Sequence, residues 1–391
     1  MPTLIRYELK KIFQNKLFLW AFLLLFIGIF YFSAYSLNQY REGVRGEYEL
    51  SDLNGVKIPE MFVASWNIDE YRAKLEAFEA DDSNYVDKGL VFNGHIYFGK
   101  YESNYLNQTP PIFVIKRECF PEYFKVYMPV KQYDIIKNAI EDNRAKAQES
   151  LTPIEKLRLD HLIDIEEKAL KDGFTVGYDY GWENILRTLS LDTGFILAAV
   201  LIFGLCNVFT GEYSGKTDSL LLTSKRGKGT LTAAKLTVSI IYSMICWAIY
   251  IFMTVSINFA YLGTEGANVG IYQSNIERFF SAVFYILLGC VLIALMTLAV
   301  SACFSKPTSS VGVSLFLGIG PLIYAEYGDE RFLKIMPVNM ISGNYIRHGE
   351  LIYFSEKIID IRCFFIPVAM ITVLICVPIM FAGYCKRQVK S

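Results

Sequence analysis

Residues 212–235, with the sequence EYSGKTDSLLLTSKRGKGTLTAAK, form a short basic segment between two long apolar runs. Its basic residues are Lys216, Lys225, Arg226, Lys228 and Lys235. Lys and Arg in short loops beside membrane spans favour the cytoplasmic side. We therefore expect residues 210–235 to be a cytoplasmic loop between two transmembrane helices, and this loop fixes how the other apolar runs are arranged.

The rest of the chain supplies the spans that such a loop requires. The 391 residues are 53% hydrophobic and 15% aromatic, which is high for a soluble protein. The apolar residues gather into runs near the 20 residues that a helix needs to cross a bilayer. Five of these runs are 17–37, 191–209, 236–262, 279–303 and 364–385.

A sixth, weaker run at 308–324 decides the topology. It contains Gly312, Gly318, Gly320 and Pro321. Basic residues precede the first run and end the chain, so counting six spans places all of them on one side, whereas five spans would leave a basic tail outside. We predict six transmembrane helices in the plasma membrane, with both termini in the cytoplasm.

Residues 1–16 predict an amphipathic helix ahead of the first span. Leu4, Ile5, Leu9, Ile12 and Phe13 recur at helical spacing, opposite Arg6, Lys10 and Lys11. An apolar stripe opposed by basic residues is typical of a helix lying on a membrane surface. The alternative is a solvated helical start that merely flanks the span.

Residues 38–190 are long enough to bury a core of their own, and they predict an α+β extracellular domain. Short strands are expected within 89–116, followed by a helix at 130–149. A second helix should begin at Thr152-Pro153-Ile154-Glu155, which is a capping box with proline at the first helical position, and end at Gly173. Residues 325–363 are expected to form a re-entrant or surface segment of broken amphipathic helices on the same side.

Catalytic and metal-binding motifs are missing from the sequence. Residues 211–217, GEYSGKT, resemble a phosphate loop, but three residues separate the glycines where the motif requires four. The three histidines, His95, His161 and His348, are scattered. We therefore expect no catalytic, cofactor-binding or metal-binding residues and no nucleic-acid partner.

The predicted spans also carry no Asp, Glu or His near their centres, which transporters driven by ion gradients usually need. Polar residues inside them are mild, and helix packing is the simpler role for these groups than a transport pathway. They include Asn207, Ser239, Ser243, Thr254 and Asn258. Any transport would need energy delivered from outside the membrane, and the basic loop is where it would arrive.

The loop resembles the one between the second and third spans of ABC-2 type transporter permeases. The residues that carry the resemblance are Glu212, Gly215-Lys216-Thr217, Leu220 to Leu222, Thr223-Ser224, Lys225-Arg226-Gly227-Lys228 and Lys235. Residues 7–16, YELKKIFQNK, are similar to the connecting helix that precedes the first span in that family. Many members have a proline where this chain has Lys225, which leaves the end of the coupling helix open.

The resemblance implies an exporter whose ATPase is a separate chain. The loop would hold a coupling helix, with Glu212, Tyr213, Thr217, Leu220, Leu221, Arg226 and Lys228 as the ATPase-coupling residues. Expected partners are two ATPase subunits that bind ATP and Mg, a second permease, identical or homologous, and the lipid bilayer. The uncharged spans favour an amphipathic cargo such as a peptide, lipid or drug.

Two alternatives remain open from the sequence. The chain could be a membrane sensor or scaffold, with a ligand-binding extracellular domain and no transport activity. The loop could also be a turn that only sets topology, with Arg226 and Lys228 contacting anionic lipid.

Overall fold

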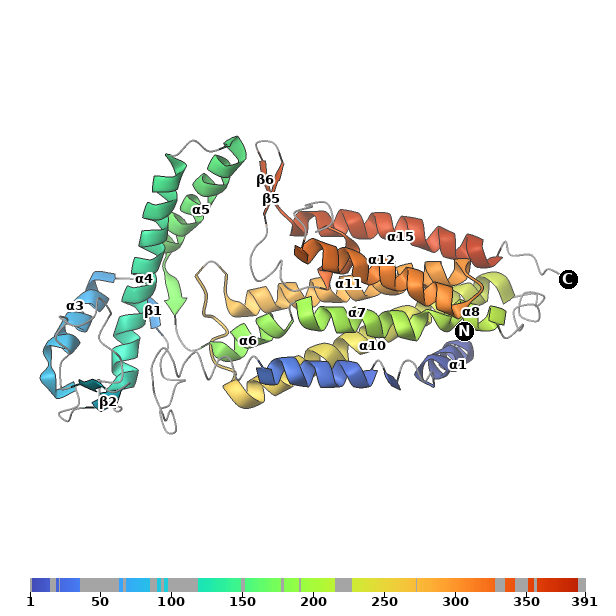
Figure 1. Cartoon of the computed structure of the whole chain (residues 1–391), viewed down its shortest axis with the longest axis horizontal. Helices are drawn as coiled ribbons and strands as arrows, with labels where there is room; N and C mark the ends of the chain where they lie inside the picture. Colours follow the sequence, from blue (N-terminus) through green and yellow to red (C-terminus); the bar gives the residue numbers. More distant parts are fainter. Residues whose placement is uncertain are drawn as a thin grey trace. The chain divides into compact units, whose positions relative to one another are not determined.

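The computed structural model in Figure 1 is mainly helical. The residues that it describes are 2–14, 19–20, 22–35, 63–65, 68–84, 90–92, 95–97, 119–148, 152–176, 179–189, 191–214, 227–271, 273–327, 335–341, 351–354 and 357–385. They divide into two compact units, one of Met1–Ala34, Asn184–Tyr261 and Arg278–Ser391, and one of Tyr35–Glu183 and Leu262–Glu277.

Among the described residues, four helices are long and apolar enough to cross a membrane. They are Thr193–Tyr213, Gly229–Leu262, Asn275–Cys303 and Arg362–Tyr384, and a shorter apolar helix covers Phe22–Tyr35. Helix α12 (Pro307–Tyr327) covers the weak run, with Pro321 inside it. These helices have the length and composition of an α-helical membrane protein.

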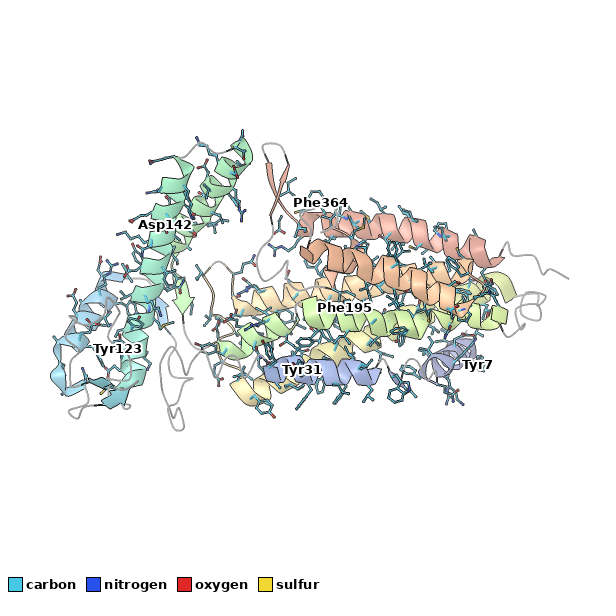
Figure 2. The ribbon with its side chains drawn as sticks, viewed as in Figure 1. Tyr7, Tyr31, Tyr123, Asp142, Phe195 and Phe364 are labelled. Carbon is cyan, nitrogen blue, oxygen red and sulfur yellow. The ribbon has the colours of Figure 1, made fainter. Side chains whose placement is uncertain are left out.

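The first unit is built around two central helices: α11 (Asn275–Cys303), and the broken helix made of α7 (Leu191–Leu205) and α8 (Asn207–Ser214). The apolar stretch of the broken helix is 67% buried and that of α11 is 56% buried. The apolar stretch of the outer helix α15 (Arg362–Cys385) is only 22% buried. Helix α12 packs along α7 and α8 (Figure 1). The outer helices carry the exposed apolar side chains, among them Tyr31 on the helix Phe22–Tyr35 (Figure 2).

The helix that ends before the basic loop is broken at Cys206, between α7 and α8. The Ser301 hydroxyl of α11 lies in the break, where it accepts from the amides of Phe209 (3.2 Å) and Thr210 (3.4 Å) and donates to the Cys206 carbonyl (2.8 Å). Ser310 of α12 donates to the same carbonyl at 3.2 Å. A side chain inserted in the backbone ladder is a known cause of a kink, so α11 and α12 stabilise this one.

Helix α10 (Gly227–Leu262) begins inside the segment that the sequence assigned to the loop. We had expected a span at 236–262, so the helix starts nine residues earlier than the apolar run, between Gly227 and Leu236. The added residues include Leu231, Ala234 and Lys235, whose side chains are buried in the protein, so packing extends the helix past the edge of the apolar run.

A buried polar network joins α6 (Tyr180–Thr188) to α10. The Asn184 amide donates to Asn258 Oδ1 at 2.5 Å, and the Asn258 amide donates to the Thr254 carbonyl at 2.8 Å. Thr193 at the start of α7 is 2.6 Å from the Tyr250 hydroxyl of α10. Asn258 therefore serves helix packing, as its mild polarity predicted.

The second unit contains a helical hairpin of α4 (Phe120–Ala147) and α5 (Pro153–Asp172), with α3 (Ile68–Ala80) packed on α4. Its described core includes Ile136, Ile140 and Phe174. The helix expected at 130–149 in fact begins at Phe120 and continues through Pro129. Tyr123, stacked on Tyr127 at 5.0 Å and packed on Phe78 of α3, stabilises the turns before the proline.

The capping box that the sequence predicted for α5 is confirmed. Thr152 accepts from the Glu155 amide at 3.4 Å, while the Glu155 carboxylate accepts from the Thr152 amide at 2.9 Å. The hydrogen bonds from the Thr152 side chain and backbone lower the pKa of Glu155 below its usual value. Gly173 ends the helix with φ +84°, a conformation that favours glycine.

The second unit also takes residues that the sequence treated as a short link. Strand β1 (Val63–Ser65) pairs antiparallel with β4 (Phe174–Val176), and Thr175 of β4 bridges to Gly270. The Asn275 amide donates to Asp179 at 2.8 Å. Segment Leu262–Glu277 is therefore part of this unit, although it follows α10 in the chain.

Two predicted segments are described in part. Strands β2 (Leu90–Phe92) and β3 (His95–Tyr97) form a hairpin within the predicted strand region 89–116, and the rest of that region lies outside the described residues. Residues 325–363 were expected to form broken helices, which is wrong for their described part. It contains a 3-10 turn η4 (Pro337–Met340) and a hairpin of β5 (Leu351–Phe354) and β6 (Lys357–Asp360).

Local sequence favours strands in this segment. Ile352, Ile358 and Ile359 favour strands, and they pair across the hairpin together with Tyr353. Met340 and Ile341 are buried against α11, where a side chain on Gly289 would collide with both. The segment is therefore anchored by close packing rather than by an amphipathic helical face.

The contact between Asn184 and Asn258 predicts a measurable coupling. In a double-mutant cycle, Asn184→Ala and Asn258→Ala should show a coupling free energy of about 0.6 to 1.7 kcal/mol, since each single change leaves a buried amide without its partner. Unfolding of the purified protein in detergent measures it. Ser243→Ala on the same helix replaces Asn258→Ala in the control cycle, because the Ser243 hydroxyl bonds within its own helix, to the Ile240 carbonyl. A coupling within error of zero would contradict the network.

Candidate functional site

The candidate site is a cluster of buried charges where α1 (Pro2–Phe13), α8 and α10 meet. Figure 1 shows α1 beside α8 at one end of the first unit. The cluster consists of Lys235, Glu212, Glu8 and Lys11, and we call it the charge cluster. Lys235 is 0% exposed, and Glu212 and Glu8 are each 3% exposed.

Lys235 is the centre of the charge cluster. Its ammonium group donates to the Val208 carbonyl at 2.6 Å and to Glu212 Oε1 at 2.6 Å, and lies 3.4 Å from Glu8 Oε2. Three N–H groups therefore face three oxygens, which is the full donor capacity of a lysine. The Phe209 ring lies 5.0 Å from the same nitrogen and adds a cation–π contact.

Glu212 is held from several sides. Besides Lys235, Lys11 lies 3.5 Å from Oε1, and the Tyr384 hydroxyl of α15 donates to Oε2 at 3.1 Å. The Tyr384 ring packs on Phe209 with 4.9 Å between centroids. Glu212 thus ties the end of α8 to three other helices, α1, α10 and α15.

Glu8 enters the charge cluster because α1 packs on protein. Leu4, Ile5 and Leu9 contact the main hydrophobic core, and Ile12 is buried within it. The helix was predicted correctly, but the stripe assigned to a membrane surface faces the bundle. Tyr7, 66% exposed, lies on the other side of α1 (Figure 2).

The charge cluster is electrically balanced, with two carboxylates and two ammonium groups. Moving such groups out of water costs several kcal/mol per ion, and the attraction between them must offset that cost. Removing one of the three buried members, Lys235, Glu212 or Glu8, leaves an uncompensated buried charge. The arrangement therefore binds α1, α8 and α10 to one geometry rather than adding a large net stability.

A cavity of about 300 Å³ adjoins the charge cluster. It is lined by Glu8, Lys11, Ile12, Gly204, Asn207, Val208, Gly211 and Pro307. Gly211 faces open space, since a side chain there would meet no atom within 4 Å. Within the described part of the chain, no donor reaches the buried Oδ1 of Asn207. The cavity thus borders the charge cluster at Glu8 and Lys11.

The residues that the sequence predicted for ATPase coupling are only partly described. Glu212 is buried in the charge cluster, so its carboxylate points into the protein. Tyr213 is half-buried and donates to the Ala302 carbonyl at 3.3 Å. Lys228 lies in α10 without a described side chain, and Thr217, Leu220, Leu221 and Arg226 lie outside the described residues.

Sequence reasoning missed Glu8, Lys235 and Tyr384 as site residues. Glu8 had a usable signal, because it lies four residues after Leu4 and four before Ile12, on the apolar stripe itself. Lys235 had another, since Ala234 and Leu236 enclose it at the edge of an apolar run. The pairing of these charges over long sequence separations left no local signal.

In the described residues, no group of three or more His, Cys, Asp or Glu is placed to hold a metal ion. What the arrangement can do physically is hold α1, α8, α10 and α15 together. Comparison of the chain with protein-family models, curated proteins and solved structures found no match.

Removing Lys235 tests the charge cluster directly. Lys235→Met should lower the free energy of unfolding by about 3 to 5 kcal/mol, because two buried carboxylates lose the one buried ammonium group that both contact. Lys11→Met is the matched control and should cost at most about 1 kcal/mol, since Lys11 is 40% exposed. Denaturation of the purified protein measures both.

A triple variant without buried charges separates charge from packing. Lys235→Met combined with Glu8→Gln and Glu212→Gln should recover most of the lost stability, since the one charge left in the cluster, on Lys11, is 40% exposed and can be solvated by water. If Lys235→Met were no more damaging than Lys11→Met, the buried charges would not be interacting as described.

Proposed function

We propose that this chain is the membrane-spanning subunit of an ABC-2 type exporter, driven by ATPase subunits on a separate chain. The observation that carries the proposal is the buried contact between Glu212 and Lys235. It supports the coupling role that the resemblance of the 212–235 segment implies.

The contact closes the base of the basic loop. Glu212 lies two residues before Ser214, where α8 ends, and Lys235 lies eight residues after Gly227, where α10 begins. Their 2.6 Å hydrogen bond brings the two ends of the segment together. A load on residues between them would act on α8 and α10 jointly, since neither helix can move alone without separating buried opposite charges.

Helix α1 extends the same connection. Glu8 contacts Lys235, and Phe13 packs edge-on against Tyr242 of α10 with 6.2 Å between centroids. The proposed connecting helix and the proposed coupling loop thus share one buried charge. This is the mechanical arrangement that an ATPase acting on the loop would need in order to move the bundle.

The proposed topology has six spans. Four are the long apolar helices, and the helix Phe22–Tyr35 and α12 would complete the set. The charge cluster would then lie near the cytoplasmic surface of the plasma membrane, with both termini on that side, and the second unit would be extracellular.

The proposed complex contains two ATPase subunits, which bind ATP and Mg, and two permeases, identical or homologous. Exposed apolar side chains such as Leu24, Phe252 and Leu374 give the first unit surfaces for lipid and for a second permease. An amphipathic peptide, lipid or drug suits spans without central charges.

Association with an ATPase tests the proposal. The tagged chain, purified in mild detergent from cells that produce it naturally, should retain an ATPase subunit and hydrolyse ATP. Leu221→Asp should weaken this association by about 2 kcal/mol, roughly thirtyfold, if Leu221 is a central anchor of the coupling helix. The bound ATPase and the hydrolysis rate are measured together.

Ile135→Asp is the matched control, because it places the same charge at an exposed apolar position of α4, outside the loop. It should leave association and hydrolysis unchanged. A chain that purifies without any ATPase, and whose Leu221→Asp variant keeps its cellular activity, would instead be a sensor or scaffold.

A further inference from the structure

The chain between α10 and α11, residues 263–274, is built into the core of the second unit, and we call it the 263–274 link. Ile271 packs against the hydrophobic core that includes Ile140. The Gly270 amide donates to the Thr175 carbonyl at 3.1 Å, and the Thr175 amide lies 3.5 Å from the Gly270 carbonyl. The link therefore adds backbone bonds to β4 and an apolar side chain to the core, as an element of the unit's own fold would.

Side chains of the second unit hold both ends of the link. At the α10 end, the ring N–H of Trp182 donates to the Thr264 carbonyl at 2.8 Å, two residues after α10 ends. At the α11 end, the Asn275 side chain donates to Asp179 at 2.8 Å and to the Gly266 carbonyl at 3.2 Å. Asn275 is 1% exposed, so little water competes for these bonds.

The link also provides the N-terminal cap of α11. The first amides of a helix have no partners within it. Here the amides of Asn275 and Ile276 donate to carbonyls of the link at 2.9 Å each. Ser274 and Glu277 form a capping box, with the Ser274 amide 3.2 Å from the Glu277 carboxylate and the Glu277 amide 3.4 Å from the Ser274 hydroxyl. The first turn of α11 is therefore ordered together with the link.

Bonds along the link leave it little slack. They fall at Thr264, Gly266, Ala267, Val269 and Gly270 before α11 begins. A slack loop would absorb a change in the second unit, whereas a bonded loop passes it on to the helices that it joins. Both of these helices are long and apolar enough to cross a membrane.

We propose that the second unit is a conformational clamp on α10 and α11. Its core keeps the 263–274 link folded, and the folded link keeps in place the two helix ends that it joins. Loosening the core of the second unit therefore loosens both helices at the link. The clamp needs no ATPase, so it can be tested whether or not the chain is an exporter.

Hydrogen exchange of the purified full-length chain in detergent, read by mass spectrometry, tests the clamp. Ile140→Val removes one methylene from the core of the second unit and should speed its opening about fivefold. Residues of one cooperative unit share the same opening free energy. The link, residues 255–262 of α10 and residues 275–282 of α11 should therefore also exchange about fivefold faster.

Ile135→Val is the matched control, because Ile135 lies on the same helix as Ile140 but is 50% exposed. It should leave exchange unchanged in all these segments. Acceleration of the link and of both helix ends in Ile140→Val supports the clamp. Acceleration that stops at the link would show a flexible tether, and an unchanged link would show that it opens independently of the core; either result overturns the clamp.

Trp182→Phe tests the α10 end separately. It keeps an aromatic ring but loses the N–H that reaches Thr264, so residues 255–262 should exchange about threefold faster. Trp247→Phe is the matched control, because it loses the same kind of bond, to the Val283 carbonyl within the first unit. It should leave the link unchanged. If Trp182→Phe did not change exchange at the α10 end, the second unit would not be holding this helix, which contradicts the clamp.

Discussion

A fully buried lysine is the constraint on which the first unit depends. Lys235 can remain charged inside the protein only if oxygens surround its ammonium group, and Val208, Glu212 and Glu8 supply them from α8 and α1. Each of these groups is placed by a different packing feature. The apolar stripe of α1 brings in Glu8, and the burial of α8 against Ser301 and Tyr384 brings in Glu212.

The break between α7 and α8 makes this geometry possible. Inserting the Ser301 hydroxyl into the backbone ladder stabilises a bend that a continuous helix would not have, and Ser310 supports the same carbonyl from α12. Tyr242 packs so close to Gly204, just before the break, that no side chain fits there, and it donates to the Val200 carbonyl at 2.9 Å. The cavity opens beside this break because Gly211, one turn further on, leaves its space unfilled.

The sequence predicted those parts of the fold that local chemistry determines. The Thr152 capping box and the Gly173 terminus of α5 follow from neighbouring residues alone. Periodicity predicted α1 as a helix but could not decide whether its stripe faced lipid or protein, because both are apolar. The predicted start of α4 at residue 130 was wrong, because the contact of Tyr123 with Phe78 stabilises helical turns that precede Pro129. The link of Glu8 to Lys235 joins residues far apart in the chain and leaves no periodic trace.

Stability alone does not explain why a chain keeps such charges. Apolar residues of similar size usually replace a buried ion pair at no loss, so an ion pair is better suited to holding one specific arrangement. Separating α8 from α10 would leave the charges of Glu212 and Lys235 unpaired among apolar side chains. Moving α1, α8 and α10 together would keep these charges paired. Intermediate positions are therefore costly, and the three helices should move as one body. The two ends of the basic segment, Glu212 and Lys235, meet within this group of three helices. A force applied to the segment would therefore reach all three helices through the contact between Glu212 and Lys235, whereas the basic residues between them provide no such connection.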